Sequence, residues 1–238
     1  TPPTARAFGI GIALRAATAD ADGALSLLSE REAAGYEADV AAEARALSAC
    51  GRAGAADAAL SLLDRIEARE GAAADSYCYV GTIQACARAA DVRRAMMVLG
   101  RAEAAGAATV HVYGAALDAC ARSGASEDAL SALEQMRARN LPVDRGCLTA
   151  AVHALLRQER WEQIFELLFE ARASGALSPD EAPASLKAIW NRAKKECGLA
   201  QKPQEGAAER RRARRRKAAR ASATAARDPK KRVRAAAR

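Results

Sequence analysis

The feature of this sequence that most restricts its fold is a pattern that recurs five times, at intervals of 34 to 36 residues. Three columns define it: a small or branched residue, a leucine four residues later, and a glycine or asparagine further on. Their members are Ala24, Ala59, Ala95, Ala129 and Ile164; Leu28, Leu63, Leu99, Leu133 and Leu168; and Gly35, Gly71, Gly106, Asn140 and Gly175. A period of this length is typical of proteins that stack one small structural unit several times.

Each unit is predicted to consist of two antiparallel helices. A small residue and a leucine four positions apart lie on one helical face, where the small residue lets a neighbouring helix approach closely. The glycine or asparagine ends that helix, because the left-handed backbone conformation used there disfavours a Cβ atom. Another helical segment precedes it in each copy, for example residues 113–121. Since neither helix can bury its apolar face alone, the units must stack into one continuous core.

The composition agrees with an all-α fold. Half of the 238 residues are hydrophobic but only 4% are aromatic, and alanine, the strongest helix former, fills long stretches. No stretch approaches the roughly 18 consecutive apolar residues that a membrane-spanning helix needs. We expect the repeats to occupy residues 1–180, a capping helix residues 181–200, and a basic, disordered tail residues 201–238.

The cysteines are expected to serve packing rather than chemistry. The chain holds six of them, namely Cys50, Cys78, Cys86, Cys120, Cys147 and Cys197. None forms a CxxC pair, and the only histidines, His111 and His153, have no companions at ligand spacing, so we expect no metal site. Cys50, Cys86 and Cys120 share one repeat position with Arg15 and Leu155, which is typical of small buried residues. Free thiols of this kind favour a reducing compartment.

The C-terminal end differs from the repeats. Residues 185–197 predict an amphipathic helix that shields the last repeat from water, with Leu186, Ile189, Trp190 and Ala193 on one stripe. Residues 201–238 then carry 15 Lys and Arg against three acidic residues, a net charge of +12. Subtracting these from the 37 basic and 29 acidic residues of the whole chain leaves 22 and 26 in residues 1–200, a net charge of −4. The excess positive charge therefore lies in the tail.

Like charges at this density repel one another and keep such a segment unfolded on its own. They also attract nucleic acid, because each phosphate contact releases condensed counterions. The residues expected to contact phosphate are Arg210, Arg211, Arg212, Arg214, Arg215, Arg216, Lys217, Arg220, Lys230, Lys231, Arg232 and Arg234. Nuclear targeting by the cluster at residues 228–233, pairing of the tail with the acidic repeats, and a purely solubilising role stay open.

The fourth copy, residues 110–144, carries the clearest family resemblance. It combines Tyr113, Cys120 followed by a basic residue and a glycine, the pair Ala129 and Leu130, and a proline–aspartate region ending at Asp144. With these features the chain resembles the pentatricopeptide repeat family over about residues 5–180. The tetratricopeptide repeat, with a period of about 34 residues and peptide ligands, is the alternative. The mean spacing of 35 residues and the aspartates that end the units favour the pentatricopeptide repeat. The resemblance implies a right-handed α-solenoid of about five two-helix repeats.

Members of this family bind single-stranded RNA, with each repeat facing one base and recognising it through its fifth and last residues. The fifth positions here are Gly9, Ala44, Val80, Gly114 and Thr149, and the last positions are Asp39, Asp75, Thr109, Asp144 and Asp180. Only Thr149 with Asp180 is a combination that in the family selects a purine, most often guanine. The other fifth positions cannot hydrogen-bond a base edge, and the acidic balance of residues 1–200 does not attract phosphate.

Two functions therefore stay open. In the first, the chain is an organellar RNA-binding protein for transcript processing, stability, translation or ribosome association, and its tail supplies the phosphate contacts. In the second, it is a protein–protein scaffold or a structural subunit of an organellar ribosome or another large assembly. The resemblance implies a chloroplast or a mitochondrion rather than the nucleus. Thr1 in place of methionine is compatible with a removed targeting segment or with a fragment.

No enzymatic activity is expected. The sequence holds no phosphate-binding loop of the GxxxxGK(S/T) or GxGxxG type and no GxSxG elbow. The acidic residues are scattered over the predicted helix surfaces, which does not favour a catalytic pair. We expect no cofactor, no small-molecule substrate and no membrane partner, and we expect RNA and proteins of a ribonucleoprotein assembly as partners.

Overall fold

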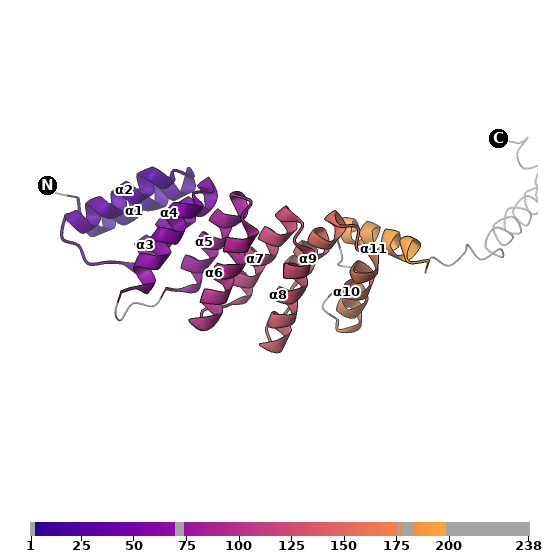
Figure 1. Cartoon of the computed structure of the whole chain (residues 1–238). Coiled ribbons are helices and arrows are strands. Elements are labelled where there is room, and N and C mark those ends of the chain that lie inside the picture. Colours follow the sequence, from indigo (N-terminus) through magenta and orange to yellow (C-terminus); the bar gives the residue numbers. More distant parts are fainter. Residues whose placement is uncertain (1–2, 70–73, 176, 178–182, 199–238) are drawn as a thin grey trace, which may run out of the picture. The chain divides into compact units, whose positions relative to one another are not determined.

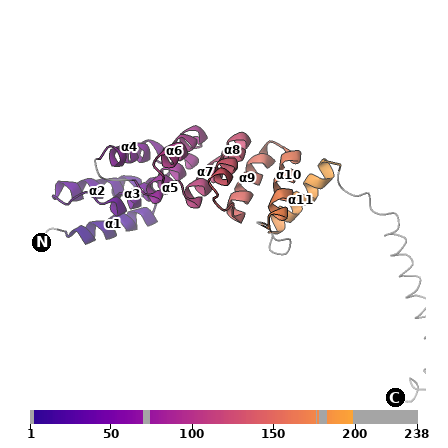
Figure 2. The ribbon, with the colours of Figure 1, turned by 90° about the horizontal axis from the view of Figure 1, so that it is seen from below.

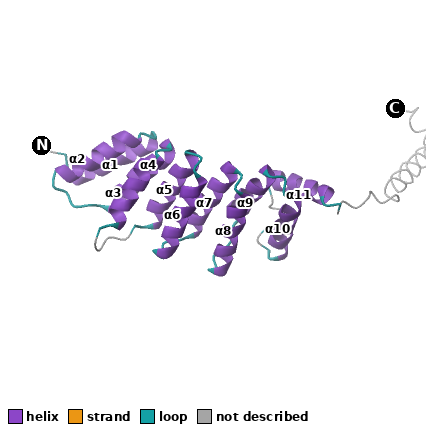
Figure 3. Cartoon of the chain, in the orientation of Figure 1, coloured by secondary structure: helices purple, strands orange, loops and turns teal. Residues whose placement is uncertain are grey.

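The structure, a computed structural model, describes residues 3–69, 74–175, 177 and 183–198. Within these ranges the chain is all-α, with eleven helices and no strand (Figures 1 and 3). The chain divides into two units, Thr1–Ala193 and Lys194–Arg238, and the repeats belong to the first. The tail predicted for residues 201–238 lies outside the described residues, so its disorder and its twelve phosphate-contacting residues stay predictions.

Ten helices form the five predicted repeats. The pairs are α1 (Ala5–Ala17) with α2 (Ala21–Ala33), α3 (Val40–Ala53) with α4 (Ala56–Glu67), α5 (Ser76–Arg88) with α6 (Val92–Ala104), α7 (Val110–Ser123) with α8 (Ser126–Ala138), and α9 (Arg145–Arg157) with α10 (Trp161–Ala173). Each odd-numbered helix packs against the next odd-numbered helix, and each even-numbered helix of the first four repeats also contacts the first helix of the following repeat. First helices thus form one layer and second helices the other (Figures 1 and 2).

Aspartates fix where several first helices begin. The side chains of Asp39, Asp75 and Asp144 accept hydrogen bonds from the backbone N–H groups of Ala41 (2.9 Å), Cys78 (2.9 Å) and Cys147 (2.8 Å). These bonds satisfy backbone donors that have no partner within the helix, and a carboxylate there also interacts favourably with the helix dipole. The aspartates that end the sequence repeats are therefore the N-caps of the next first helix. The first helix of the fourth repeat, predicted for residues 113–121, begins three residues earlier in the structure, at Val110 of α7.

Residues in the left-handed conformation separate the helices. The predicted terminators of the second helices are confirmed at four places, Gly35, Gly106, Asn140 and Gly175, with φ angles of 82°, 70°, 56° and 77°; Gly71 lies outside the described residues. A second left-handed position, not recognised as a column in the sequence, lies between the two helices of each repeat. Its members are Ala19, Gly54, Ala90, Gly124 and Glu159. Three of the five carry a Cβ atom there, so no glycine column marks this turn in the sequence.

Small residues let the first helices approach closely. A Cβ atom added to Gly81 in α5 would lie 2.9 Å from the carbonyl carbon of Leu47 in α3, too close for any side chain. The predicted cysteine column is part of this core, because Cys50, Cys86 and Cys120 are fully buried. Burial raises the pKa of the Cys50 thiol to about 11 and that of Cys120 to about 12, which keeps both thiols protonated at neutral pH.

Ion pairs connect the second helices of neighbouring repeats. Arg101 of α6 bonds both Asp64 and Glu67 of α4, each at 2.6 Å. Arg94–Asp57 joins the same two repeats, and further pairs between neighbouring repeats are Arg65–Glu32, Arg137–Glu170, Arg139–Glu103 and Arg160–Glu127. Seven acidic residues of the second helices are therefore paired with arginines.

The helix α11 (Ala184–Glu196) covers the last repeat, as the sequence predicted. Leu186 and Ala193 are buried, and the Trp190 ring stacks on Phe165 of α10 with a centroid distance of 5.0 Å. The guanidinium of Arg192 lies 4.6 Å from the centre of the Trp161 ring, an attractive cation–π geometry. The amphipathic stripe thus finds its partner on α10.

Candidate nucleic-acid interface

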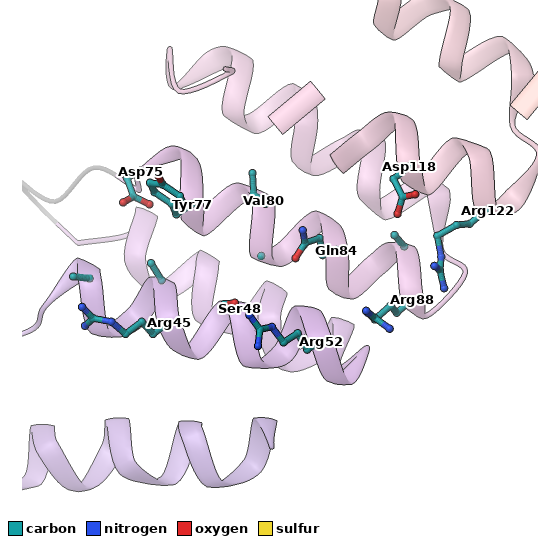
Figure 4. A pocket seen from close by; sticks show the side chains of 14 residues that line it. Arg45, Ser48, Arg52, Asp75, Tyr77, Val80, Gln84, Arg88, Asp118 and Arg122 are labelled. Carbon is teal, nitrogen blue, oxygen red and sulfur yellow. The ribbon is translucent and has the colours of Figure 1, made fainter. Parts of the chain in front are cut away.

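A groove runs along the first-helix layer in the middle of the array. An open pocket of about 780 Å³ lies along α3 and α5 and reaches α7 (Figure 4). A neighbouring pocket of about 550 Å³ lies along α5 and α7. The two pockets share Tyr77, Val80, Gln84 and Asp118. They form one continuous groove, which we call the central groove.

Half of the predicted base-recognition positions line the central groove. Ala44, Asp75 and Val80 line the first pocket, and Val80, Thr109 and Gly114 line the second. The fifth positions of consecutive repeats therefore lie side by side, as the resemblance implies. Gly9, Asp39, Thr149 and Asp144 lie outside these two pockets, and Asp180 lies outside the described residues.

The structure gives some of these residues further roles. Besides the N-cap bonds of Asp39, Asp75 and Asp144, the Thr149 hydroxyl donates a hydrogen bond to the carbonyl oxygen of Arg145, at 2.7 Å. This bond leaves only acceptor lone pairs on Thr149 for a base edge. The Thr109 Oγ1, by contrast, is buried and has no hydrogen-bond partner among the described residues, so it keeps its full hydrogen-bonding capacity.

Arginines at the groove are the residues that sequence reasoning missed. Arg45, Arg52, Arg88 and Arg122 all line the first pocket. Arg52, Arg88 and Arg122 recur with Arg157 at spacings of 36, 34 and 35 residues, at the C-terminal ends of the first helices. This column was present in the sequence and could have been found by the same self-comparison that revealed the leucines.

The electrostatics of the groove differ from those of the repeats as a whole. The first pocket is lined by these four arginines and by two acidic residues, Asp75 and Asp118, which gives a net charge of +2. The exposed side chains of Arg45, Arg88 and Arg122 form no ion pair with any described residue. The expectation that the acidic balance of residues 1–200 leaves the groove unattractive to phosphate is therefore wrong at this surface, because most paired acidic residues lie on the second helices.

Aromatic rings accompany the arginines. Tyr77 on α5 is 70% exposed and lines both pockets, and His111 on α7 is exposed and lines the second. Each is three residues before a fifth position, so the rings flank Val80 and Gly114 at the groove surface. Aromatic side chains in a positive groove provide surfaces on which nucleic-acid bases stack.

Known proteins share both the repeat and the fold of this chain. Residues 111–141 match the family model for the PPR repeat. The fold matches the pentatricopeptide repeat protein PPR10 from maize with a TM-score of 0.63 and 21% sequence identity. The chain therefore shares the α-solenoid fold of the pentatricopeptide repeat protein PPR10, and one of its repeats matches the family model. The match covers 82% of this chain but only 28% of the PPR10 chain, so the chain spans less than a third of the length of that protein.

Two further structures that match the solenoid contain RNA. One is PPR10 in complex with an 18-nt psaJ RNA element, with a TM-score of 0.62, 16% identity and coverage of 82% of this chain and 28% of that one. The other is the PPR domain of Arabidopsis thaliana protein-only RNase P 1 with tRNA, with a TM-score of 0.62 and 14% identity, covering 77% of this chain and 95% of that one. The sequence matches no curated protein.

The described residues offer neither a grouped metal site nor a membrane span. Across 3–69, 74–175, 177 and 183–198, no three His, Cys, Asp or Glu side chains are grouped so that they could hold a metal ion. No helix in those ranges has both the length and the apolar character required to cross a bilayer.

Proposed function

We propose that this pentatricopeptide-repeat solenoid binds single-stranded RNA in the central groove. The observation that carries the proposal is the combination of three exposed arginines without ion-pair partners among the described residues and two aromatic rings in one groove on the first-helix layer. Two proteins with the same fold form complexes with RNA, which supports RNA as the ligand.

The arginines and the rings have separate roles in this proposal. Arg88 and Arg122 lie at the ends of consecutive first helices, with Arg45 at the opposite side of the pocket (Figure 4), and their guanidinium groups contact phosphates. Such contacts position the RNA but carry no sequence information. Tyr77 and His111 stack on bases, which holds the base edges toward the first helices.

The tail and the cellular setting extend the proposal. Residues 201–238, with a net charge of +12, add phosphate contacts outside the groove. We place the protein in a chloroplast or a mitochondrion, where it takes part in transcript processing, stability, translation or ribosome association. The support for this placement is the family resemblance. We further propose that the chain binds without catalysing a reaction.

The second candidate is a scaffold that holds protein in the same groove, within an organellar ribosome or another large assembly. The observation that favours it is that Gly9, Ala44, Val80 and Gly114 have no side-chain group that could hydrogen-bond a base. A scaffold would stay with large particles at high salt, and the purified protein would not bind free RNA.

The proposed function is tested by removing the groove charge. The variant Arg45→Gln/Arg88→Gln/Arg122→Gln is compared with the unchanged protein, both without residues 206–238, for binding of a labelled 20-nucleotide RNA of mixed sequence by fluorescence anisotropy. We expect a loss of affinity of roughly tenfold or more at low salt, because three phosphate contacts are removed.

The matched control removes three arginines from the second helices, as Arg65→Gln/Arg93→Gln/Arg137→Gln. It changes the net charge equally but leaves the groove intact, so its affinity should stay within about twofold of the unchanged protein. Equal losses in both variants would show that binding follows net charge rather than the groove, and absence of RNA binding by the unchanged protein would favour the scaffold.

A further inference from the structure

The base that faces the fourth repeat meets an unusual surface, because its fifth position is Gly114. A Cβ atom added at Gly114 would have no neighbouring heavy atom within 4 Å, so the space above α7 at this point is open. Since Gly114 has no side chain, nothing at this position blocks a base that enters the second pocket. The edge can therefore pass over the helix backbone toward the next turn of α7.

Polar side chains lie one helical turn beyond the fifth positions. Residues four apart share a helical face, and the residues four after the fifth positions of the second, third and fourth repeats are Ser48, Gln84 and Asp118. All three line the first pocket, and Gln84 and Asp118 also line the second. Figure 4 shows Asp118 directed from α7 toward the groove, whereas the Oε1 of Gln84 lies on the side of α3, 3.3 Å from where a Cβ atom of Gly51 would be. None of the three side chains hydrogen-bonds another residue of the described ranges.

We infer that the base opposite the fourth repeat is recognised one turn beyond the fifth position, by Asp118, and that Asp118 selects guanine. This inference rests on the proposed function, and it names the residue that gives the central groove sequence preference. Tyr77 and His111, which line the same pocket, hold the base by stacking, so that its Watson–Crick edge faces Asp118.

The choice of guanine follows from the chemistry of a carboxylate. An ionised aspartate offers two acceptor oxygens and no donor. Guanine presents two adjacent donors on its Watson–Crick edge, N1–H and the N2 amino group, and can bond both oxygens at once. Adenine, cytosine and uracil each present a donor next to an acceptor, which would face the second carboxylate oxygen and repel it. Gln84 carries an acceptor oxygen beside an amino group that donates. It matches a donor next to an acceptor, which guanine also presents at N1–H and O6, and therefore discriminates less among the four bases.

The experiment uses the full chain and a pool of single-stranded RNA with a randomised centre. RNA retained by the unchanged protein and by Asp118→Asn is sequenced after selection. We expect a guanine preference at one position for the unchanged protein. With Asp118→Asn, which replaces one acceptor oxygen by a donor, that preference should fall by about tenfold or more, the scale of discrimination by one bidentate contact. A matched pair of RNAs that differ only in guanine or adenine at this position then gives the ratio of affinities directly.

Asp128→Asn is the matched control, because Asp128 is an exposed aspartate on α8 that lines neither pocket. It removes the same charge and should leave the preference unchanged. Circular dichroism melting confirms that both variants fold. If the unchanged protein binds RNA but shows no guanine preference, or if Asp118→Asn keeps it, the inference is wrong while the proposed function stands. If the unchanged protein binds no RNA, both are wrong.

Discussion

At the scale of single residues, the left-handed residue between the two helices of a repeat lowers the unfolding free energy of the protein when it carries a Cβ atom. Ala90 occupies the left-handed position there with a φ angle of 59°, which costs an L-residue about 1–2 kcal/mol. The change Ala90→Gly removes this strain but gives the unfolded chain more freedom, which offsets about 0.4–1 kcal/mol. We expect a net gain in unfolding free energy of about 0.5 kcal/mol, measured by urea titration.

The reverse change at the equivalent turn supplies the control. A Cβ atom at Gly54, whose φ angle is 78°, would lie 3.2 Å from the Cβ atom of Arg88. Gly54→Ala combines backbone strain with this tight contact and should lose about 1 kcal/mol or more. A gain from Gly54→Ala, or a loss from Ala90→Gly, would contradict the strain argument at this turn.

At the scale of helices, the ion pairs of the second-helix layer differ in how strongly they join repeats. Arg101 is 24% exposed in its side chain and contacts two carboxylates on α4, whereas Arg137 is 47% exposed and contacts only Glu170. Exposed single pairs contribute about 0.2–1 kcal/mol. We expect Arg101→Met to lower the unfolding free energy by about 1 kcal/mol and Arg137→Met by less than half of that. Urea midpoints that are equal for the two variants would rule out this ranking.

The helices themselves were predictable from sequence to different degrees. Burial requires the same small residues and leucines in each copy, so the leucine column and the terminators, such as Gly106 and Asn140, identified every second helix. The turn at Ala90 was missed because alanine in the left-handed conformation leaves no sequence signature. Sequence reasoning missed Asp118 because the equivalent residues of the other repeats differ from it in chemistry. A residue that binds a base need not be the same in every repeat. The bond from Thr149 to the Arg145 carbonyl depends on a rotamer, which no spacing reveals.

At the scale of the whole chain, positive charge lies at two places, and salt dependence can separate them. On single-stranded nucleic acid the logarithm of affinity falls by about 0.7 per unit of log salt for each neutralised phosphate. If Arg45, Arg88 and Arg122 each contact one phosphate, the chain without residues 206–238 should keep a slope of about −2. With about six to ten further contacts from the tail, the full chain should show a slope steeper by about 4 to 7.

The measurement is the dissociation constant for one 30-nucleotide RNA between 50 and 300 mM salt. Three proteins are compared: the full chain, the shortened chain, and the shortened chain with the three groove arginines changed to glutamine. The last protein should lose nearly all of the remaining slope. A full chain whose slope equals that of the shortened chain would show that the tail makes no phosphate contact. A shortened chain with no slope would place all phosphate contacts in the tail, and base recognition at Asp118 would then require an RNA held from outside the groove.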